Sequence, residues 1–318
     1  MRRILKKVSD DTKLMVKVCD LYYNNDMKQE EIASKLSISR ATISRILKNA
    51  KSEGIVKIEV INPLKNDYYK LEKQLEEKFH LKEVIIAEDV TDASYERDAL
   101  GKTCAEFLQR VLKDGEIVGL SMGKTIKTIA QYVHQDKPRD ISFVPLLGGM
   151  GQVGIELHCN QIVIDFFRAF GGEYHLLHAP AMIADPNLML SLKNDIHIKQ
   201  VFDLLDRITT AVVGIGTAVP GSTMMETGYY KKEDIVEMKN SGIVGDICLQ
   251  MYDIEGNTDY SYNNDIFGIN LESLKKVRRV VGISAGEEKV KAIKGALNGK
   301  IVNVLVTNSS TAKLLLED

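Results

Sequence analysis

A lysine and a threonine close the stretch Gly119–Thr125 (GLSMGKT), which lies between an apolar run and a segment with helical periodicity. Glycine allows a tight turn there, and the backbone N–H groups at the start of a helix attract an anion. Lys124 adds a positive charge and Thr125 a hydroxyl donor. A Walker A loop would require glycine where Val118 stands, so an NTPase is disfavoured. The stretch favours a phosphate or polyol site, with an ordinary strand-to-helix turn as the alternative.

A second glycine-rich stretch covers residues 146–154 (LLGGMGQVG), in which Gly149, Gly151 and Gly154 match the pattern GxGxxG. In a dinucleotide site, an acidic residue follows at the end of the next strand, about 20 residues further on. Glu173 lies at about this distance, but before the next predicted strand. We therefore interpret the stretch as a second backbone cradle for a small ligand, with a dinucleotide site as the weaker alternative.

Two further charged residues stand where a ligand could meet them. Lys289 closes the stretch 284–289 (SAGEEK), again between a predicted strand and a helix, and could help to bind an anion. The alternative is a solvated lysine that Glu287 and Glu288 offset. Asp246 stands at a probable strand end and could accept hydrogen bonds from sugar hydroxyls, or simply form a turn.

Residue types for catalysis or metal binding do not gather in this sequence. The six histidines show no metal-ligand spacing, no GxSxG elbow occurs, and the four cysteines are scattered without a CxxC pair. We expect no cofactor, no metal and no enzymatic activity.

The stretch 29–48 (QEEIASKLSISRATISRILK) has the pattern of two helices joined by a tight turn. Apolar residues stand where two crossed helices must touch, and Ser39 precedes the second helix as a good N-cap. This spacing indicates a helix-turn-helix whose second helix, residues 40–50, enters the DNA major groove. The alternative is an ordinary helical hairpin with a basic outer face. The expected DNA-contacting residues are Gln29, Ser39, Arg40, Thr42, Ser44, Arg45 and Lys48.

Charge is distributed unevenly along the chain. Residues 1–60 hold 13 lysines and arginines against 8 acidic residues, whereas the whole chain of 318 residues has a net charge of −2. A basic head on an acidic body suits a small module that meets phosphate and a larger one that does not. No apolar run is long enough to span a membrane and no signal peptide is present, so we expect a cytoplasmic protein with reduced thiols.

Periodicity predicts two domains. In the first, residues 1–61, a helix over 12–25 precedes the helix-turn-helix, and IVKIEV (55–60) reads as a strand that forms a small wing. Asn62-Pro63 marks the boundary with the second domain, residues 62–318. A charged helix over 66–80 opens that domain, and it either pairs with its copy in a dimer or packs on its own body.

From residue 82 onward, predicted strands alternate with helices, which is typical of an α/β protein with a mostly parallel sheet. Ligands in such sheets bind beyond the carboxyl ends of the strands, where the glycine-rich stretches fall. The strands are expected over residues 83–88, 116–121, 142–147, 174–179, 210–216, 245–253, 277–286 and 302–307.

A helix-turn-helix followed in order by GLSMGKT (119–125), PLLGGMG (145–151), GDIC (245–248) and an AGxxK-type loop (285–289) resembles the SorC family, also called SorC/DeoR. These are sugar-responsive bacterial transcriptional regulators, and the resemblance covers about residues 20 to 316. It implies a body similar to sugar-phosphate isomerase and deaminase folds without their catalysis.

The resemblance also implies a phosphorylated sugar or related metabolite as effector, and a homodimer or homotetramer on a palindromic operator. It places Lys289 across from the phosphate-side loop and Asp246 toward the sugar. The effector-binding residues that it implies are Ser121, Gly123, Lys124, Thr125, Leu147, Gly148, Gly149, Met150, Asp246 and Lys289.

We therefore expect a DNA-binding regulator controlled by such a metabolite. One alternative is a sugar-phosphate isomerase or deaminase, but it would need a paired carboxylate or a histidine base in the pocket, and Asp246 alone is a poor candidate. Another is a dinucleotide-binding sensor that uses the GMGQVG stretch (149–154).

Overall fold

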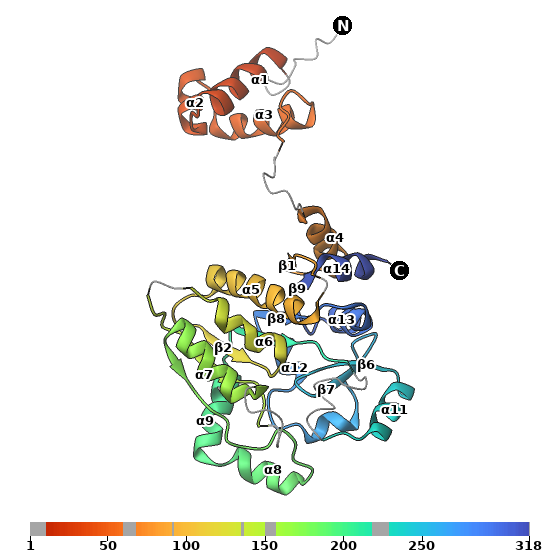
Figure 1. Cartoon of the computed structure of the whole chain (residues 1–318). Helices are drawn as coiled ribbons and strands as arrows, with labels where there is room; N and C mark the ends of the chain where they lie inside the picture. Colours follow the sequence, from red (N-terminus) through yellow and green to blue (C-terminus); the bar gives the residue numbers. More distant parts are fainter. Residues whose placement is uncertain are drawn as a thin grey trace. The chain divides into compact units, whose positions relative to one another are not determined.

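The computed structural model divides the chain into two compact units, residues 1–67 and 68–318. The residues whose structure is described are 11–59, 68–90, 92–134, 137–149, 157–217 and 229–317. Figure 1 labels the helices and strands of both units.

The first unit is a small helical bundle (Figure 1). Its elements are α1 (Thr12–Cys19), the π-helical turn Asp20–Asn24, α2 (Gln29–Leu36) and α3 (Arg40–Ser52). Apolar residues at helical spacing meet in one core, which includes Met15, Val18, Ile32, Ile43 and Ile46. The predicted helix, turn and helix over 29–48 are therefore confirmed.

The chain reverses between α2 and α3 at Ser37, whose φ of 53° is left-handed. Ser39 then caps α3, because its side chain accepts a hydrogen bond from the Thr42 N–H at 3.1 Å. The predicted N-cap is confirmed, and it fixes where the outward face of α3 begins.

The predicted wing strand over 55–60 is wrong for residues 55–59, which form no strand. Ile55 and Val56 instead pack against the helical core, and the Val56 N–H donates to the Ala50 carbonyl at 3.1 Å. Residues 11–59 contain no strand with which this segment could pair, so its apolar side chains extend the bundle. Residue 60 and the predicted boundary at 62–63 lie outside the described residues.

The second unit is built on a seven-stranded sheet with the strand order β1-β9-β8-β5-β2-β3-β4, in which every pairing is parallel. This confirms the predicted α/β class. The strands of this sheet are β1 (Glu83–Ala87), β2 (Ile117–Leu120), β3 (Ser142–Pro145), β4 (Glu173–Tyr174), β5 (Thr210–Gly214), β8 (Arg279–Ile283) and β9 (Val304–Asn308).

Helices cover both faces of the sheet. Strand residues alternate between two apolar clusters, so that Val212 faces one and Val213 the other. On the first face lie α5 (Ala93–Val111), α6 (Lys124–Ile129) and α7 (Cys159–Phe170), which Figure 1 shows side by side. The remaining helices are α4 (Tyr69–Phe79), α8 (Pro186–Lys193), α9 (Ile196–Leu205), α11 (Lys232–Asn240), α12 (Leu271–Leu274), α13 (Val290–Asn298) and α14 (Ser309–Leu316).

The α4 helix packs on its own body, one of the two arrangements expected for it. Leu75 is buried in the core, and two carboxylates of α4 accept backbone N–H groups of the edge strand β1. Glu76 accepts from Val84 at 2.9 Å, and Glu72 accepts from Ile86 at 3.0 Å. The helix therefore covers backbone donors that an edge strand would otherwise expose.

Two predicted strands differ from the structure. The strand expected over 174–179 is limited to β4, because the chain leaves the sheet and Asn160 binds both backbone groups of Leu177 in place of a neighbouring strand. The strand expected over 245–253 is a hairpin of β6 (Ile243–Ile247) and β7 (Gln250–Asp253).

The turn of this hairpin is Cys248-Leu249, with φ of 54° and 61°. Two-residue turns of this kind usually contain asparagine, aspartate or glycine, which tolerate positive φ. Both residues are buried here, so packing of their side chains holds a backbone conformation that the residue types disfavour. This is why periodicity predicted a single strand.

Candidate functional site

The strand order of the body contains a switch point. The chain leaves β2 toward β3 on one side, and leaves β5 toward β8 on the other, although β2 and β5 are neighbours. In open α/β sheets, such a reversal creates a crevice outside the carboxyl ends of the two strands, where ligands bind. The residues that follow β2 and β5 are therefore the first to consider.

Ser121, directly after β2, ties the two strands together. Its side chain is buried, accepts the Gly214 N–H at 3.2 Å, and donates to the Met122 carbonyl at 3.1 Å. It also hydrogen-bonds the Cys248 thiol at the hairpin turn. Since this hydroxyl is engaged within the protein, its contribution to a ligand site is to position the strand ends.

Gly123 begins α6 with φ of 146°, a conformation that L side chains rarely adopt. Lys124 and Thr125 form the first turn of α6 and are half-buried. The predicted turn from strand to helix is confirmed, and it brings a positive charge and a hydroxyl to the β2 end of the crevice.

The first residues of the loop after β3, Leu147 to Gly149, donate their backbone N–H groups to other parts of the body. Gly148 N–H donates to the Phe267 carbonyl at 2.9 Å, and Gly149 N–H donates to the Ala179 carbonyl at 2.8 Å. The Leu147 N–H donates to the Cys159 sulfur. These three amides give no support to the predicted backbone cradle, because each already has a partner. Met150 lies outside the described residues.

Asp246 of β6 lies against the residues that follow β5. Its backbone pairs with Gly216 in both directions, at 2.9 and 3.2 Å. A Cβ atom at Gly216 would lie 2.1 Å from Asp246 Oδ1, so only glycine leaves room for the carboxylate. The side chain is 5% exposed, and Oδ1 has no hydrogen-bond partner in the described part of the chain.

Burial raises the pKa of Asp246 to about 6, although the positive charge of Lys289 and a backbone hydrogen bond from Leu249 act in the other direction. Burial lowers the pKa of Lys289, which Asp246 and Glu288 partly restore. The Lys289 ammonium donates to Thr217 Oγ1 at 3.2 Å. The structure thus brings Asp246 and Lys289, which are far apart in sequence, to one end of β5.

Two residues of this site were missed by sequence reasoning. Thr217 is buried and follows β5 by three residues, a position from which its role could have been suspected. Tyr230 precedes α11 and is 5% exposed, yet its hydroxyl has no partner among the described residues. Of the charged groups near Tyr230, Asp246 raises the pKa of its hydroxyl most, after burial itself. No sequence signal marks Tyr230.

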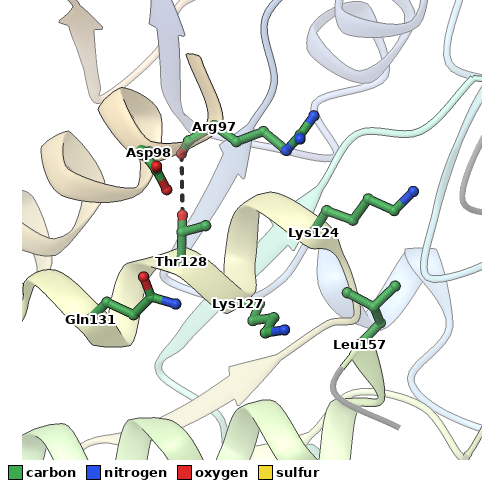
Figure 2. Close-up of a pocket in the computed structure, with 7 residues that line it drawn as sticks. All are labelled: Arg97, Asp98, Lys124, Lys127, Thr128, Gln131 and Leu157. Atoms are coloured by element: carbon green, nitrogen blue, oxygen red, sulfur yellow. Dashed lines mark hydrogen bonds between the residues drawn. The ribbon is translucent and has the colours of Figure 1, made fainter. Parts of the chain in front are cut away.

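An open groove lies between α5 and α6, with a volume of about 340 Å³ (Figure 2). Thr128 Oγ1 donates to the Arg97 carbonyl at 3.1 Å and holds the two helices close. Figure 2 shows Lys124 extending from the start of α6, so its charge belongs to this mostly basic surface as well as to the turn after β2. The lining residues are Arg97, Asp98, Lys124, Lys127, Thr128, Gln131 and Leu157.

In the first unit, the outward face of α3 carries the exposed side chains Ser44, Arg45 and Lys48. Two other predicted DNA contacts are engaged within the unit. Arg40 forms an exposed ion pair of 2.9 Å with Glu30 of α2, and the Thr42 hydroxyl lies 2.8 Å from that of Ser39. Ser39 is itself exposed, and Gln29, the first residue of α2, is half-buried.

Within the described ranges, no group of three or more histidine, cysteine, aspartate or glutamate side chains could hold a metal ion. The helices of those ranges include none that is long and apolar enough to cross a membrane.

A basic helix-turn-helix unit and a parallel α/β body with a polar crevice define the class of ligand-responsive transcription regulators. Residues 65–317 match the Sugar-bind family of sugar-binding domains. The chain is 35% identical to the sorbitol operon regulator of Klebsiella pneumoniae, over 97% of this chain and 99% of that one. It is 32% identical to the deoxyribonucleoside regulator of Bacillus subtilis, over 96% and 97%.

Solved structures of transcriptional regulators are also similar to this chain. The full-length sorbitol operon regulator SorC from Klebsiella pneumoniae gives a TM-score of 0.74 at 34% identity, covering 97% of this chain and 99% of that one. A DeoR family transcriptional regulator from Listeria monocytogenes gives 0.72 at 31% identity, covering 79% and 100%. The chain therefore belongs to the SorC/DeoR family of transcriptional regulators, with a sugar-binding effector domain, and its relatives are regulators rather than enzymes.

Proposed function

We propose that a phosphorylated sugar, or a related metabolite, binds in the crevice between β2 and β5 and controls binding of operator DNA. The observation that carries this proposal is the partly buried Lys289 ammonium, 3.2 Å from the Thr217 hydroxyl and within the field of the Asp246 carboxylate. A buried cation beside a hydroxyl suits a phosphate, and a buried carboxylate suits the hydroxyl groups of a sugar.

The turn after β2 supports the same assignment. Gly123 keeps the backbone close to the crevice, while Lys124 and Thr125 add a second cation and a hydroxyl donor. Phosphate groups are commonly held by such combinations of lysine, hydroxyl and backbone N–H groups. The proposal therefore has a phosphate between the β2 end and Lys289, with the sugar toward Asp246.

The proposal divides the labour between residues 1–61, which bind DNA, and residues 62–318, which bind the effector and form the oligomer. In the first part, α3 acts as the recognition helix. Arg45 and Ser44 face base edges, and Lys48 faces the phosphate backbone. Arg40 contacts DNA from the position in which Glu30 holds it.

A homodimer or homotetramer on a palindromic operator follows from this division, because two α3 helices must reach successive major grooves. The effector changes operator affinity only if it binds one arrangement of the paired heads better than the other. Because a bacterial regulator must reach DNA, the proposal places the protein in the cytoplasm.

The test uses the full chain and a duplex that the protein itself selects from a random pool. Electrophoretic retardation is measured at moderate salt with a panel of phosphorylated sugars, their unphosphorylated forms and inorganic phosphate. We expect at least one phosphorylated sugar to change the affinity for DNA, and its unphosphorylated form to have little effect. If no duplex is selected, or no phosphorylated sugar alters the retardation, the proposal is wrong.

A further inference from the structure

Two buried polar atoms without a partner belong to Asp246, which lies at this crevice, and to Tyr230, on whose hydroxyl Asp246 acts electrostatically. Asp246 Oδ1 and the Tyr230 hydroxyl are each on side chains that are 5% exposed, and neither has a hydrogen bond within the described ranges. Only Thr307 Oγ1 shares this condition among the described side chains. A buried polar group without a partner destabilises the fold, so each such group needs an explanation.

Tyr230 belongs to the apolar cluster that also contains Ile247 and Cys248, the residues directly after Asp246. Asp246 is the charged group that acts most strongly on the Tyr230 hydroxyl. The Tyr230 ring packs edge-on against Tyr262, with 6.4 Å between ring centroids, and is thereby held in place. The Asp246 carboxylate lies against Gly216, which follows β5 at the crevice. Both atoms are thus buried, one against Gly216 and the other on a ring inside the apolar cluster.

Tyr252 of β7 provides a comparison. It is also fully buried and also within the field of Asp246, but its hydroxyl donates to the Ala292 carbonyl at 3.0 Å. The same residue type in the same cluster is therefore satisfied at one position and unsatisfied at the other. Burial of the tyrosine alone does not account for the difference, so Tyr230 has a hydroxyl that the fold does not use.

We infer that the Tyr230 hydroxyl and Asp246 Oδ1 together bind one hydroxyl group of the effector, so that the site selects a hydroxylated sugar over its deoxy analogue. A ligand hydroxyl has one donor and two acceptor positions. It can donate to the Asp246 carboxylate, which only accepts, while it accepts from the Tyr230 O–H. This inference rests on the proposed function, and it adds a specificity-determining residue to that site.

A ligand that lacks this hydroxyl would leave both atoms unpaired in a site from which it has excluded water. Discrimination of this kind exceeds what an apolar pocket achieves, because the unpaired groups belong to the protein and cannot move away. We expect the deoxy analogue to bind about 10- to 100-fold more weakly.

The experiment measures binding to the full chain by isothermal titration calorimetry. The probes are pairs of sugar phosphates that differ by one hydroxyl, such as ribose 5-phosphate with 2-deoxyribose 5-phosphate, and glucose 6-phosphate with its singly deoxy forms. The variants are Tyr230→Phe and two controls, Tyr252→Phe and Thr307→Val. Thr307 lies on β9, which β8 separates from β5, so its unpaired hydroxyl is distant from the switch point.

For at least one pair, we expect the wild-type protein to prefer the hydroxylated member about tenfold or more, and Tyr230→Phe to lose most of this preference. Both controls should keep it. Equal binding of both members of every pair, or a full preference in Tyr230→Phe, would overturn the inference while leaving the proposed function intact. If no sugar phosphate binds the wild-type protein, the proposed function fails first and the inference fails with it.

A second measurement does not depend on the ligand. Thermal unfolding without effector should show Tyr230→Phe to be at least as stable as the wild type, because the lost hydroxyl had no partner. Tyr252→Phe should be less stable, because it removes the hydrogen bond that the buried hydroxyl donates to the Ala292 carbonyl. A loss of stability in Tyr230→Phe equal to that in Tyr252→Phe would show that the Tyr230 hydroxyl is satisfied by the fold, and would overturn the inference.

Discussion

In the helix-turn-helix unit, polar side chains proposed to contact DNA project from the exposed face of α3. In the body, the polar side chains of the crevice are buried or half-buried and come from segments far apart in the sequence. Arg45 and Lys48 are exposed, while Asp246 and Thr217 are almost fully buried. Exposed charges are hydrated before and after folding, but buried ones lose water that the fold does not replace. Substitutions on the exposed face of α3 should therefore change the stability of the fold little. Polar side chains of the crevice, in contrast, lower the stability of the fold and are available to bind a ligand.

The largest effect should come from the partly buried cation Lys289. Lys289→Met keeps the length of the side chain and removes its charge, so the affinity for a phosphorylated effector should fall about 100-fold or more. Affinity for operator DNA without effector should stay the same. The measurement is calorimetric titration of the effector beside DNA retardation. If the variant bound effector normally, Lys289 would not belong to the effector site.

The next effect is on the pH dependence of stability, which should distinguish the buried carboxylate of Asp246 from an exposed one. Because the pKa of Asp246 is raised to about 6, the folded state holds this proton more tightly than the unfolded state, whose pKa is near 3.8. Its contribution to stability is therefore present at low pH and is lost as the pH rises through about 4 to 6, by up to about 3 kcal/mol.

Asp246→Asn should lack this loss, so that its free energy of unfolding relative to wild type increases from about pH 4 to about pH 7. Urea unfolding over this range measures the difference. Asp203→Asn, at an exposed carboxylate paired with Lys199 on α9, is the matched control and should follow the wild type. Parallel curves for Asp246→Asn and wild type would mean that the carboxylate is hydrated.

A smaller effect is expected on the exposed face of α3. Arg45→Ala should weaken binding of the selected operator about 10- to 100-fold and relax its sequence preference, because a base-contacting arginine contributes about 1–3 kcal/mol. Effector binding and thermal stability should be unchanged. Arg168→Ala, at an exposed arginine of α7 in the body, is the control and should leave DNA binding intact. Loss of both DNA and effector binding in Arg45→Ala would contradict the division of labour.

The smallest effect belongs to Lys48. Its replacement by alanine should weaken binding to all duplexes alike, and should reduce the slope of log affinity against log salt by about 1. Titrations at several salt concentrations, with the operator and a scrambled duplex, test this. If only the operator lost affinity, Lys48 would be reading bases instead of phosphates.

Local sequence patterns were sufficient to predict the helices of the first unit, but not the conformation of the segment that follows them. The helix-turn-helix depends on spacing, a cap and apolar contacts within about 20 residues, and these interactions are nearly all present in the sequence itself. The wing strand was wrong because a strand needs a neighbour, which periodicity cannot supply.

In the body, the parallel sheet and the turn at Gly123–Thr125 could be predicted, and Asp246 and Lys289 stay predicted effector-binding residues. The hairpin turn at Cys248-Leu249 could not, because its backbone opposes the preferences of its residues and is held only by packing. The amides of the loop after β3 read as donors in sequence, yet those of Leu147, Gly148 and Gly149, which lie in the described part of the loop, already have partners.

The amino-acid order by itself determined the alternation of most helices and strands, which loops are rich in glycine, and which end of the chain is basic, because these depend on neighbours along the chain. Only the tertiary structure decided which polar atoms are satisfied. Tyr230 and Tyr252 are of the same residue type. Whether the tyrosine hydroxyl donates to a carbonyl or stays unpaired depends on the segment, distant in sequence, that packs against it. That difference is what assigns one tyrosine to the fold and leaves the other for a ligand.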